Sequence, residues 1–155
     1  MKYEIERKFL VKKDLWEKVE KPNAEIYRQG YISTEPERTV RVRAAEGKAF
    51  LTIKGISKGA RRLEYEYEIP FADANELLYQ FAVSSVDKIR YKVNFGGKVW
   101  EVDEYLYNNS GLITAEIELE SEDEEFEMPK WVGEEVTDDA RYFNSNLSVN
   151  PFNKW

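Results

Sequence analysis

The sequence predicts a mainly β protein of the α+β class, with about eight antiparallel strands and a few flanking helices. Most of the chain alternates apolar and charged side chains, which is the period of a strand with two unlike faces. Only three short stretches have the spacing of a helix. The 155 residues are 42% hydrophobic and contain no linker-like segment, so we expect residues 1–155 to form a single domain.

The first strand is predicted within residues 1–11, which read MKYEIERKFLV. Successive side chains of a strand point to opposite faces, so Glu4, Glu6 and Lys8 share one face. A short helix is expected over residues 14–20, with Asp14 as its N-cap and a leucine, a tryptophan and a valine on its apolar side.

The rest of the chain continues as strands interrupted by two helices. Further strands are predicted at residues 25–32, 39–45, 49–55, 61–70, 88–95, 98–105 and 114–120. A helix is expected over residues 73–82, and Gly96-Gly97 predicts a hairpin turn. A last helix is expected over residues 140–147, with Thr137, Asp138 and Asp139 as its N-cap and first turn.

The charged faces of the strands allow two interpretations. An antiparallel sheet with one solvated face would alternate in this way. However, the charges are segregated, with basic residues in strands 39–45 and 88–95 and acidic ones in strands 98–105 and 114–120. The alternative is an eight-stranded antiparallel β-barrel, closed around a charged interior, with its apolar faces under the helices. Like charges ~7 Å apart repel by ~2.4 kcal/mol at a dielectric constant near 20, so that interior would need an anion or a metal ion.

Composition narrows the chemistry. The chain contains neither histidine nor cysteine, which excludes Ser-His-Asp and thiol nucleophiles and leaves carboxylates, Lys, Arg, Tyr or a metal-bound water. Oxygen ligands favour Mg²⁺, Mn²⁺ or Ca²⁺. The formal net charge of -7 argues against a nucleic-acid polymer as partner. No apolar run could span a bilayer and no export signal is seen, so we expect a cytoplasmic protein without a membrane partner.

The segment EIERKFLV resembles the ExExK opening of the CYTH, or triphosphate tunnel metalloenzyme, superfamily in its short bacterial type. RQGYI, VRVR, TIKG, RLEYE, KIRY, AEIEL and WVGEEVTDDARYFNSNL resemble later segments in the family's order. The resemblance implies a β-tunnel that hydrolyses a phosphoanhydride bond of inorganic triphosphate with Mg²⁺ or Mn²⁺, and nucleoside triphosphates more weakly. It leaves open a class IV-type adenylate cyclase, a thiamine triphosphatase, or a module that binds polyphosphate without turnover. It also allows a homodimer.

The resemblance also assigns roles to residues of the charged faces. It implies that triphosphate is bound by Lys8, Arg41, Arg43, Lys54, Arg62, Lys88 and Arg90. It implies that metal ions are held by Glu4, Glu6, Glu118, Glu116, Glu64 and Glu66. Catalytic roles fall to Lys54 and Tyr31, which the family uses as a pair, and to Glu116.

Overall fold

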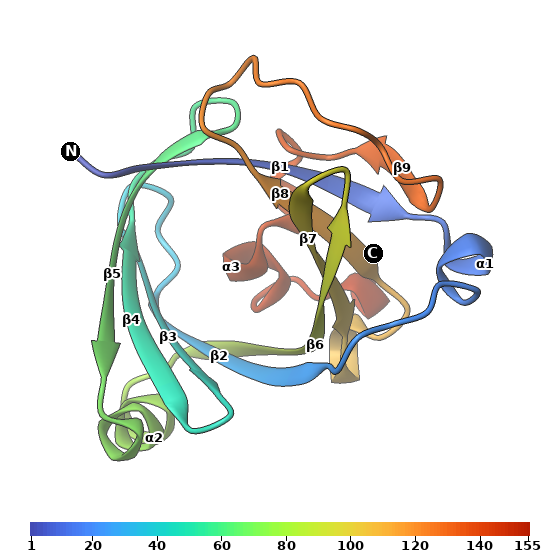
Figure 1. Cartoon of the computed structure of the whole chain (residues 1–155). Coiled ribbons are helices and arrows are strands. Elements are labelled where there is room, and N and C mark those ends of the chain that lie inside the picture. Colours follow the sequence, from blue (N-terminus) through green and yellow to red (C-terminus); the bar gives the residue numbers. More distant parts are fainter.

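The structure is a computed structural model that describes all residues from 1 to 155, and it is built mainly from strands (Figure 1). The elements are β1 (Tyr3–Val11), α1 (Lys13–Trp16), β2 (Glu25–Ser33), β3 (Thr39–Ala45), β4 (Lys48–Lys54), β5 (Arg61–Ile69), α2 (Phe71–Gln80), β6 (Ser84–Phe95), β7 (Lys98–Tyr105), η1 (Tyr107–Asn109), β8 (Ile113–Glu118), β9 (Val132–Glu135), η2 (Ala140–Tyr142), α3 (Asn144–Leu147) and η3 (Phe152–Lys154). None of the helices combines the length and the hydrophobicity that crossing a membrane requires.

Eight of the strands form a closed antiparallel barrel. Their order is β5-β4-β3-β2-β6-β7-β8-β1, and a pairing between β1 and β5 closes the ring. The ninth strand, β9, pairs only with the C-terminal half of β1, where Phe9 lies opposite Glu135. The closed eight-stranded barrel predicted from the sequence is therefore confirmed, and β9 is an addition that alternation did not predict.

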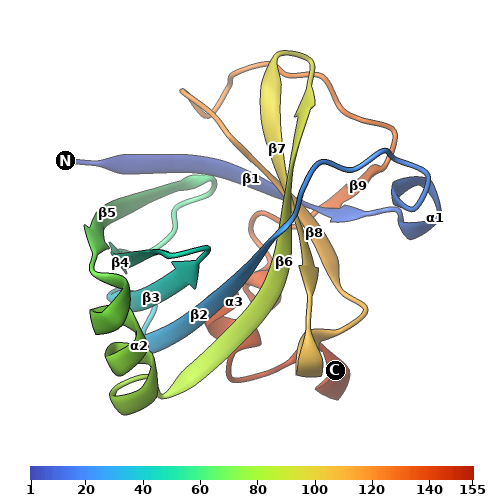
Figure 2. The same cartoon turned by 60° about the horizontal axis from the view of Figure 1, so that its bottom comes forward.

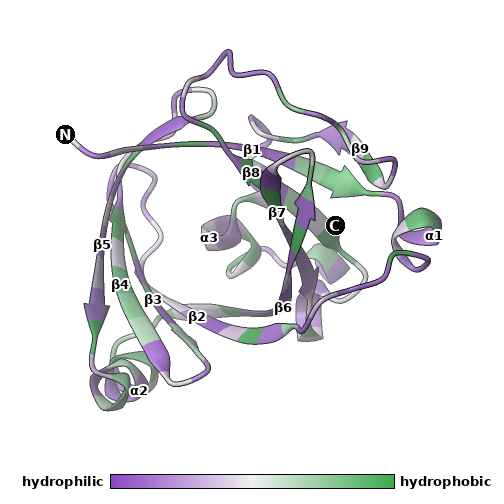
Figure 3. Ribbon diagram, viewed as in Figure 1, coloured by the Kyte–Doolittle hydropathy of each residue, from purple (hydrophilic) through white to green (hydrophobic).

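The apolar faces of the barrel strands point outward, and the rest of the chain covers a large part of them, while Ile26, Ile53 and Tyr67 stay exposed. On β1, β7 and β8 the outward residues form a cluster with Trp16 and Trp131, in which Trp100 is fully buried. On the other side, α2 covers β3 and β4, and Ala74 of α2 packs against Val42 and Ala49. Figure 3 shows the underlying alternation as green and purple stretches along the strands. The charged faces consequently point into the barrel, so the interpretation of a solvated outer face is wrong.

Several element boundaries differ from prediction. The first helix is only α1, which begins after Lys12 without a side-chain cap, so Asp14 is not its N-cap. The second helix, α2, begins at Phe71 and has Pro70 as its N-cap, a position where the missing backbone N–H of proline removes no helical hydrogen bond. β6 begins at Ser84, earlier than predicted.

The predicted last helix is divided into η2 and α3 by Phe143, whose backbone is extended. Asp139 caps η2 by accepting a hydrogen bond from the backbone N–H of Arg141. Thr137 caps no helix, because its Oγ1 accepts a hydrogen bond from the backbone N–H of Lys8. The segment from η2 to α3 lies across one end of the barrel (Figures 1 and 2).

Candidate active site

The barrel encloses a cavity, here called the tunnel, with a volume of about 270 Å³. Of the 25 residues that line the tunnel, only four are hydrophobic. Every candidate site residue named from the sequence lines it. Alternation places these residues in the tunnel because every second side chain of a barrel strand points to the interior. Glu4, Glu6 and Lys8 of β1 are an example.

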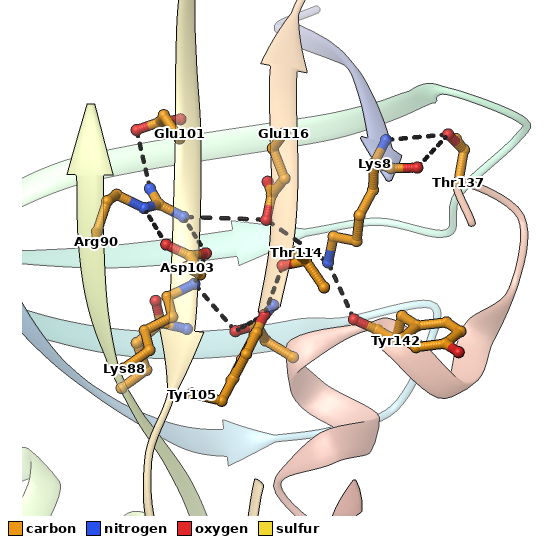
Figure 4. Close-up of polar contacts among 12 residues, drawn as sticks. Lys8, Lys88, Arg90, Glu101, Asp103, Tyr105, Thr114, Glu116, Thr137 and Tyr142 are labelled. Atoms are coloured by element: carbon orange, nitrogen blue, oxygen red, sulfur yellow. Dashed lines mark hydrogen bonds and ion pairs between the residues drawn. The ribbon is translucent and has the colours of Figure 1, made fainter. Parts of the chain in front are cut away.

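One wall of the tunnel, on β6, β7, β8 and β1, is organised around the buried carboxylate of Asp103 (Figure 4). Arg90 donates to this carboxylate through Nε at 2.7 Å and Nη2 at 2.9 Å, and Lys88 Nζ lies 2.8 Å from it. Burial alone would raise the pKa of Asp103, but the two cations outweigh burial and lower it. Asp103 was not among the residues predicted for the site, although it belongs to the charged face of its strand.

The same wall brings Lys8 and Glu116 together. Lys8 Nζ lies 3.6 Å from Glu116 Oε1, and Arg90 Nη2 lies 3.9 Å from the same oxygen. Glu6 of β1 lies beside Glu116, and the two carboxyl groups shift each other's pKa. Burial and the charges of Glu116 and Glu4 raise the pKa of Glu6 well above its usual value. The pKa of Glu116 is well below its usual value, because Lys8, its neighbour Glu6 and the charge of Arg90 together outweigh the effect of burial. The two pKa shifts have opposite signs, so Glu6 binds a proton more readily than Glu116 does.

The opposite wall is organised around Lys54 of β4. Its Nζ lies 3.2 Å from Glu4 of β1 and 3.1 Å from Glu64 of β5. Burial opposes its charge, but the surrounding carboxylates raise the pKa of Lys54. Lys54 is therefore an ammonium at neutral pH and cannot accept a proton as it stands. Tyr31 lies in the same tunnel, where its hydroxyl accepts a hydrogen bond from Gln29, and no hydrogen bond joins it to Lys54.

Three arginines complete the basic set. Arg41 and Arg43 of β3 lie 3.5 and 3.7 Å from Glu66. Arg62 of β5 is held by uncharged groups, since it donates to the Gly55 carbonyl and to Thr39 Oγ1. The charges do not occupy separate basic and acidic regions, as the segregation in the sequence had suggested. Cations and carboxylates come from strands one or two positions apart in the barrel, and most tunnel cations lie within 4 Å of a carboxylate.

The carboxylates fit a divalent metal ion in their chemistry. Glu4 and Glu6 of β1 and Glu116 and Glu118 of β8 lie on paired strands, where Glu6 is directly opposite Glu118. Carboxylate oxygens are the donors that Mg²⁺ and Mn²⁺ prefer. No three of these side chains converge as a ligand set in this conformation, in which Glu4 and Glu64 both turn to Lys54. Rotation of the side chains toward an ion would be needed.

The C-terminal segment closes the tunnel wall at one end. Lys8 Nζ donates to the carbonyl of Tyr142 at 3.0 Å, and Lys88 Nζ donates to Asn144 Oδ1 at 3.1 Å. Phe143 and Thr137 also line the tunnel, although no role was predicted for them there. Tyr27 of β2 is another lining residue that the prediction missed, and its parity, shared with Tyr31, was the signal that could have identified it. Lys92 and Glu101 also line the tunnel and were not predicted for the site.

Comparison with known proteins agrees with this geometry. The model of the CYTH domain family matches residues 2–148. The inorganic triphosphatase of Acetivibrio thermocellus is 51% identical over 150 residues, covering 96% of this chain and 95% of the relative. That of Nitrosomonas europaea is 35% identical over 154 residues, covering 94% and 97%. A crystal structure of an inorganic triphosphatase has a TM-score of 0.64 at 33% identity, covering 94% of this chain and 97% of that one.

Proposed function

This chain belongs to the CYTH domain family, and on that premise we propose that it hydrolyses inorganic triphosphate in its tunnel with the help of Mg²⁺ or Mn²⁺. The observation that carries the proposal is the enclosed set of cations and carboxylates, in a chain 51% identical to a protein named inorganic triphosphatase. Guanidinium and ammonium groups bind phosphate oxygens, and carboxylates bind divalent cations.

The roles follow from the arrangement of the walls. Phosphoryl transfer depends mainly on positioning and on neutralising negative charge. Water forms the new bond to phosphorus while the bond to the pyrophosphate leaving group breaks. We propose that Lys88 and Arg90, fixed by Asp103, bind one part of the chain of phosphates, and that Arg41 and Arg43 bind another. A metal ion held by Glu4, Glu6, Glu116 and Glu118, with Glu64 and Glu66 nearby, would supply further positive charge at the reacting phosphate.

In this proposal Lys54 acts as a cation or as an acid, and not as a base. Its raised pKa keeps it charged, so it suits neutralisation of the phosphate oxygens or donation of a proton to the leaving group. Tyr31 donates no hydrogen bond to the protein, so its hydroxyl proton is available to a phosphate or to the attacking water.

The test is phosphate release from inorganic triphosphate, ATP and thiamine triphosphate, each with Mg²⁺, Mn²⁺ or EDTA. We expect metal-dependent release, fastest from inorganic triphosphate and abolished in Glu4→Ala/Glu6→Ala with an unchanged circular dichroism spectrum. Glu122→Ala/Asp123→Ala, which removes two carboxylates outside the tunnel, is the matched control and should retain activity.

The other results would overturn the proposal in distinct ways. Cyclic nucleotide and pyrophosphate from ATP would indicate a cyclase, and fastest release from thiamine triphosphate would indicate a thiamine triphosphatase. Binding of triphosphate without any turnover would indicate a binding module. Weaker hydrolysis of nucleoside triphosphates, a homodimer and a cytoplasmic location stay predictions.

A further inference from the structure

Arg43 is held in the tunnel by aromatic rings. Its guanidinium carbon lies 5.0 Å from the ring centroid of Tyr27 and 5.5 Å from that of Phe50. No hydrogen bond joins its side chain to the protein, and the carboxylate within ion-pair range, that of Glu66, is 3.7 Å away. Its side chain is only 16% exposed. Two rings therefore surround a largely buried cation whose N–H groups are not used by the protein.

Tyr27 contacts a second cation in the same way. The guanidinium carbon of Arg90 lies 4.9 Å from the Tyr27 ring centroid. The strand order β4-β3-β2-β6 explains both contacts. Arg43 is directly paired with Phe50 on one side and with Gln29 on the other, while Arg90 is paired with Glu25. On β2, Tyr27 is the inward residue between these two partners, so one diagonal contact reaches each arginine. Phe50, Arg43, Tyr27 and Arg90 alternate as ring, cation, ring and cation across four adjacent strands.

The alternation of rings and cations holds each guanidinium in place without using its N–H groups. Burial lowers the pKa of Arg43, and the charges of Arg41 and Arg90 lower it further, so the cations are crowded before any anion arrives. The face of an aromatic ring carries negative charge density and attracts a guanidinium without accepting its N–H bonds. A carboxylate in the same place would occupy the donors that a phosphate needs.

We propose that Tyr27 and Phe50 are positioning residues that hold Arg43 between their rings, and that Tyr27 also steadies Arg90, so that both guanidinium groups are oriented toward triphosphate. The inference rests on the proposed function, because triphosphate is taken as the anion. It assigns the roles to the rings and not to the Tyr27 hydroxyl.

The first test compares Tyr27→Leu, Tyr27→Phe and Phe50→Leu in steady-state hydrolysis of inorganic triphosphate. We expect KM to rise roughly tenfold in both leucine variants, the value for a loss of ~1.4 kcal/mol, and to stay within about twofold in Tyr27→Phe. Tyr67→Leu, which removes an exposed ring outside the tunnel, is the control for loss of a tyrosine. Equal damage in Tyr27→Phe and Tyr27→Leu would overturn the proposal, because it would assign the role to the hydroxyl.

A double-mutant cycle tests whether the rings act through Arg43. In the Arg43→Ala background, Phe50→Leu should raise KM by less than about twofold, since its cation is gone. An undiminished tenfold effect would show that Phe50 acts elsewhere and would contradict the proposal.

A substrate-free measurement separates this inference from the proposed function. In the ¹⁵N-edited NMR spectrum, the Nε–H protons of Arg43 and Arg90 should be shifted upfield by the Tyr27 ring, retain that shift in Tyr27→Phe and lose it in Tyr27→Leu. A wild-type protein without triphosphatase activity would refute the function but leave this result standing. Unchanged arginine resonances in folded Tyr27→Leu would refute the positioning role.

Discussion

Asp103 is the carboxylate on which two cations of the tunnel depend. It is fully buried, and its two oxygens together accept from Arg90 and Lys88. A buried carboxylate is tolerated only when it is paired, and each of these cations is likewise buried. Asp103 does not line the tunnel, so its role is to hold the cations that do.

Replacing Asp103 with Asn should therefore affect both stability and binding. Two buried cations would lose their shared anion, so we expect a loss of ~3–5 kcal/mol in the free energy of unfolding and a raised KM for triphosphate. Urea denaturation and steady-state kinetics measure these effects. The control is Glu101→Gln, which removes a more exposed partner of the same Arg90, at 3.0 Å, and should cost ~1 kcal/mol or less. Equal losses in the two variants would contradict the central position given to Asp103.

Lys88 gives the tunnel a predictable pH dependence. Burial lowers its pKa to about 8, and the charge of Arg90 adds to that effect. Asp103 opposes it only in part because its charge is shared with Arg90, and Glu116 contributes a weaker opposing charge. Tyr105, whose ring lies beside Lys88, stays neutral because burial raises its own pKa.

The ammonium form of Lys88 is the one that binds phosphate, so kcat/KM should fall as pH rises through about 8. Stability should change in the opposite direction. Between about pH 8 and the ordinary lysine pKa the unfolded chain binds more protons than the folded one, so folding becomes more favourable as pH rises. In Lys88→Arg the alkaline loss of kcat/KM should disappear, as guanidinium does not titrate in this range. An alkaline limb unchanged in that variant would assign the titration to another group.

At the scale of single elements, alternation predicted the strands well and the helices less well. Each barrel strand has enough charged and apolar residues to fix its faces, and the parity of Arg41 or Lys54 followed directly. β9 contains only four residues, too few for a period to be recognised, and α1, which also has four residues, is shorter than the helix predicted over residues 14–20. Pairings across strands, such as that of Lys54 with Glu4, depend on barrel closure and could not be read from one strand alone.

The packing of α2 on the barrel depends on a glycine of β2. A Cβ atom at Gly30 would lie 2.5 Å from Leu78 Cδ2 and 2.9 Å from the Cβ of Ala82. Both distances are shorter than real contacts, so the helix must approach the strand at a position without a side chain. The glycine of the RQGY sequence therefore has a structural reason. The residues on either side of Gly30 point into the barrel, and Gly30 itself faces α2.

Gly30→Ala should consequently displace α2 and lower the free energy of unfolding by ~1–3 kcal/mol, the usual cost of overpacking. Urea denaturation is the measurement. Gly55→Ala is a matched control, because its Cβ would make an ordinary contact at 3.4 Å with Leu63. Stability unchanged in Gly30→Ala would mean that α2 is not packed as closely on β2 as the structure shows.

At the scale of the whole molecule, the barrel resolves a conflict between charge and burial. It places an array of cations within a protein of formal net charge -7, and it compensates them with carboxylates from strands one or two positions away. Among the tunnel arginines, Arg62 and Arg43 are the least compensated, since Arg62 has no carboxylate partner within 4 Å and Arg43 has one at 3.7 Å. The interior therefore remains short of anionic charge around these arginines, where a polyanion can bind.

An anion that completes this compensation should stabilise the folded protein, because the unfolded chain has no assembled tunnel to bind it. At a concentration 100 times its Kd, a ligand adds ~2.7 kcal/mol, which for a domain of this size raises Tm by about 5–10 °C. We expect this shift with inorganic triphosphate, measured by thermal denaturation in EDTA so that no turnover occurs. The shift should be clearly smaller in Arg43→Ala at the same concentration, whereas Arg38→Ala, outside the tunnel, should retain it. Equal Tm shifts in the two variants would indicate that the anion binds outside the tunnel, at a site that does not depend on closure of the barrel.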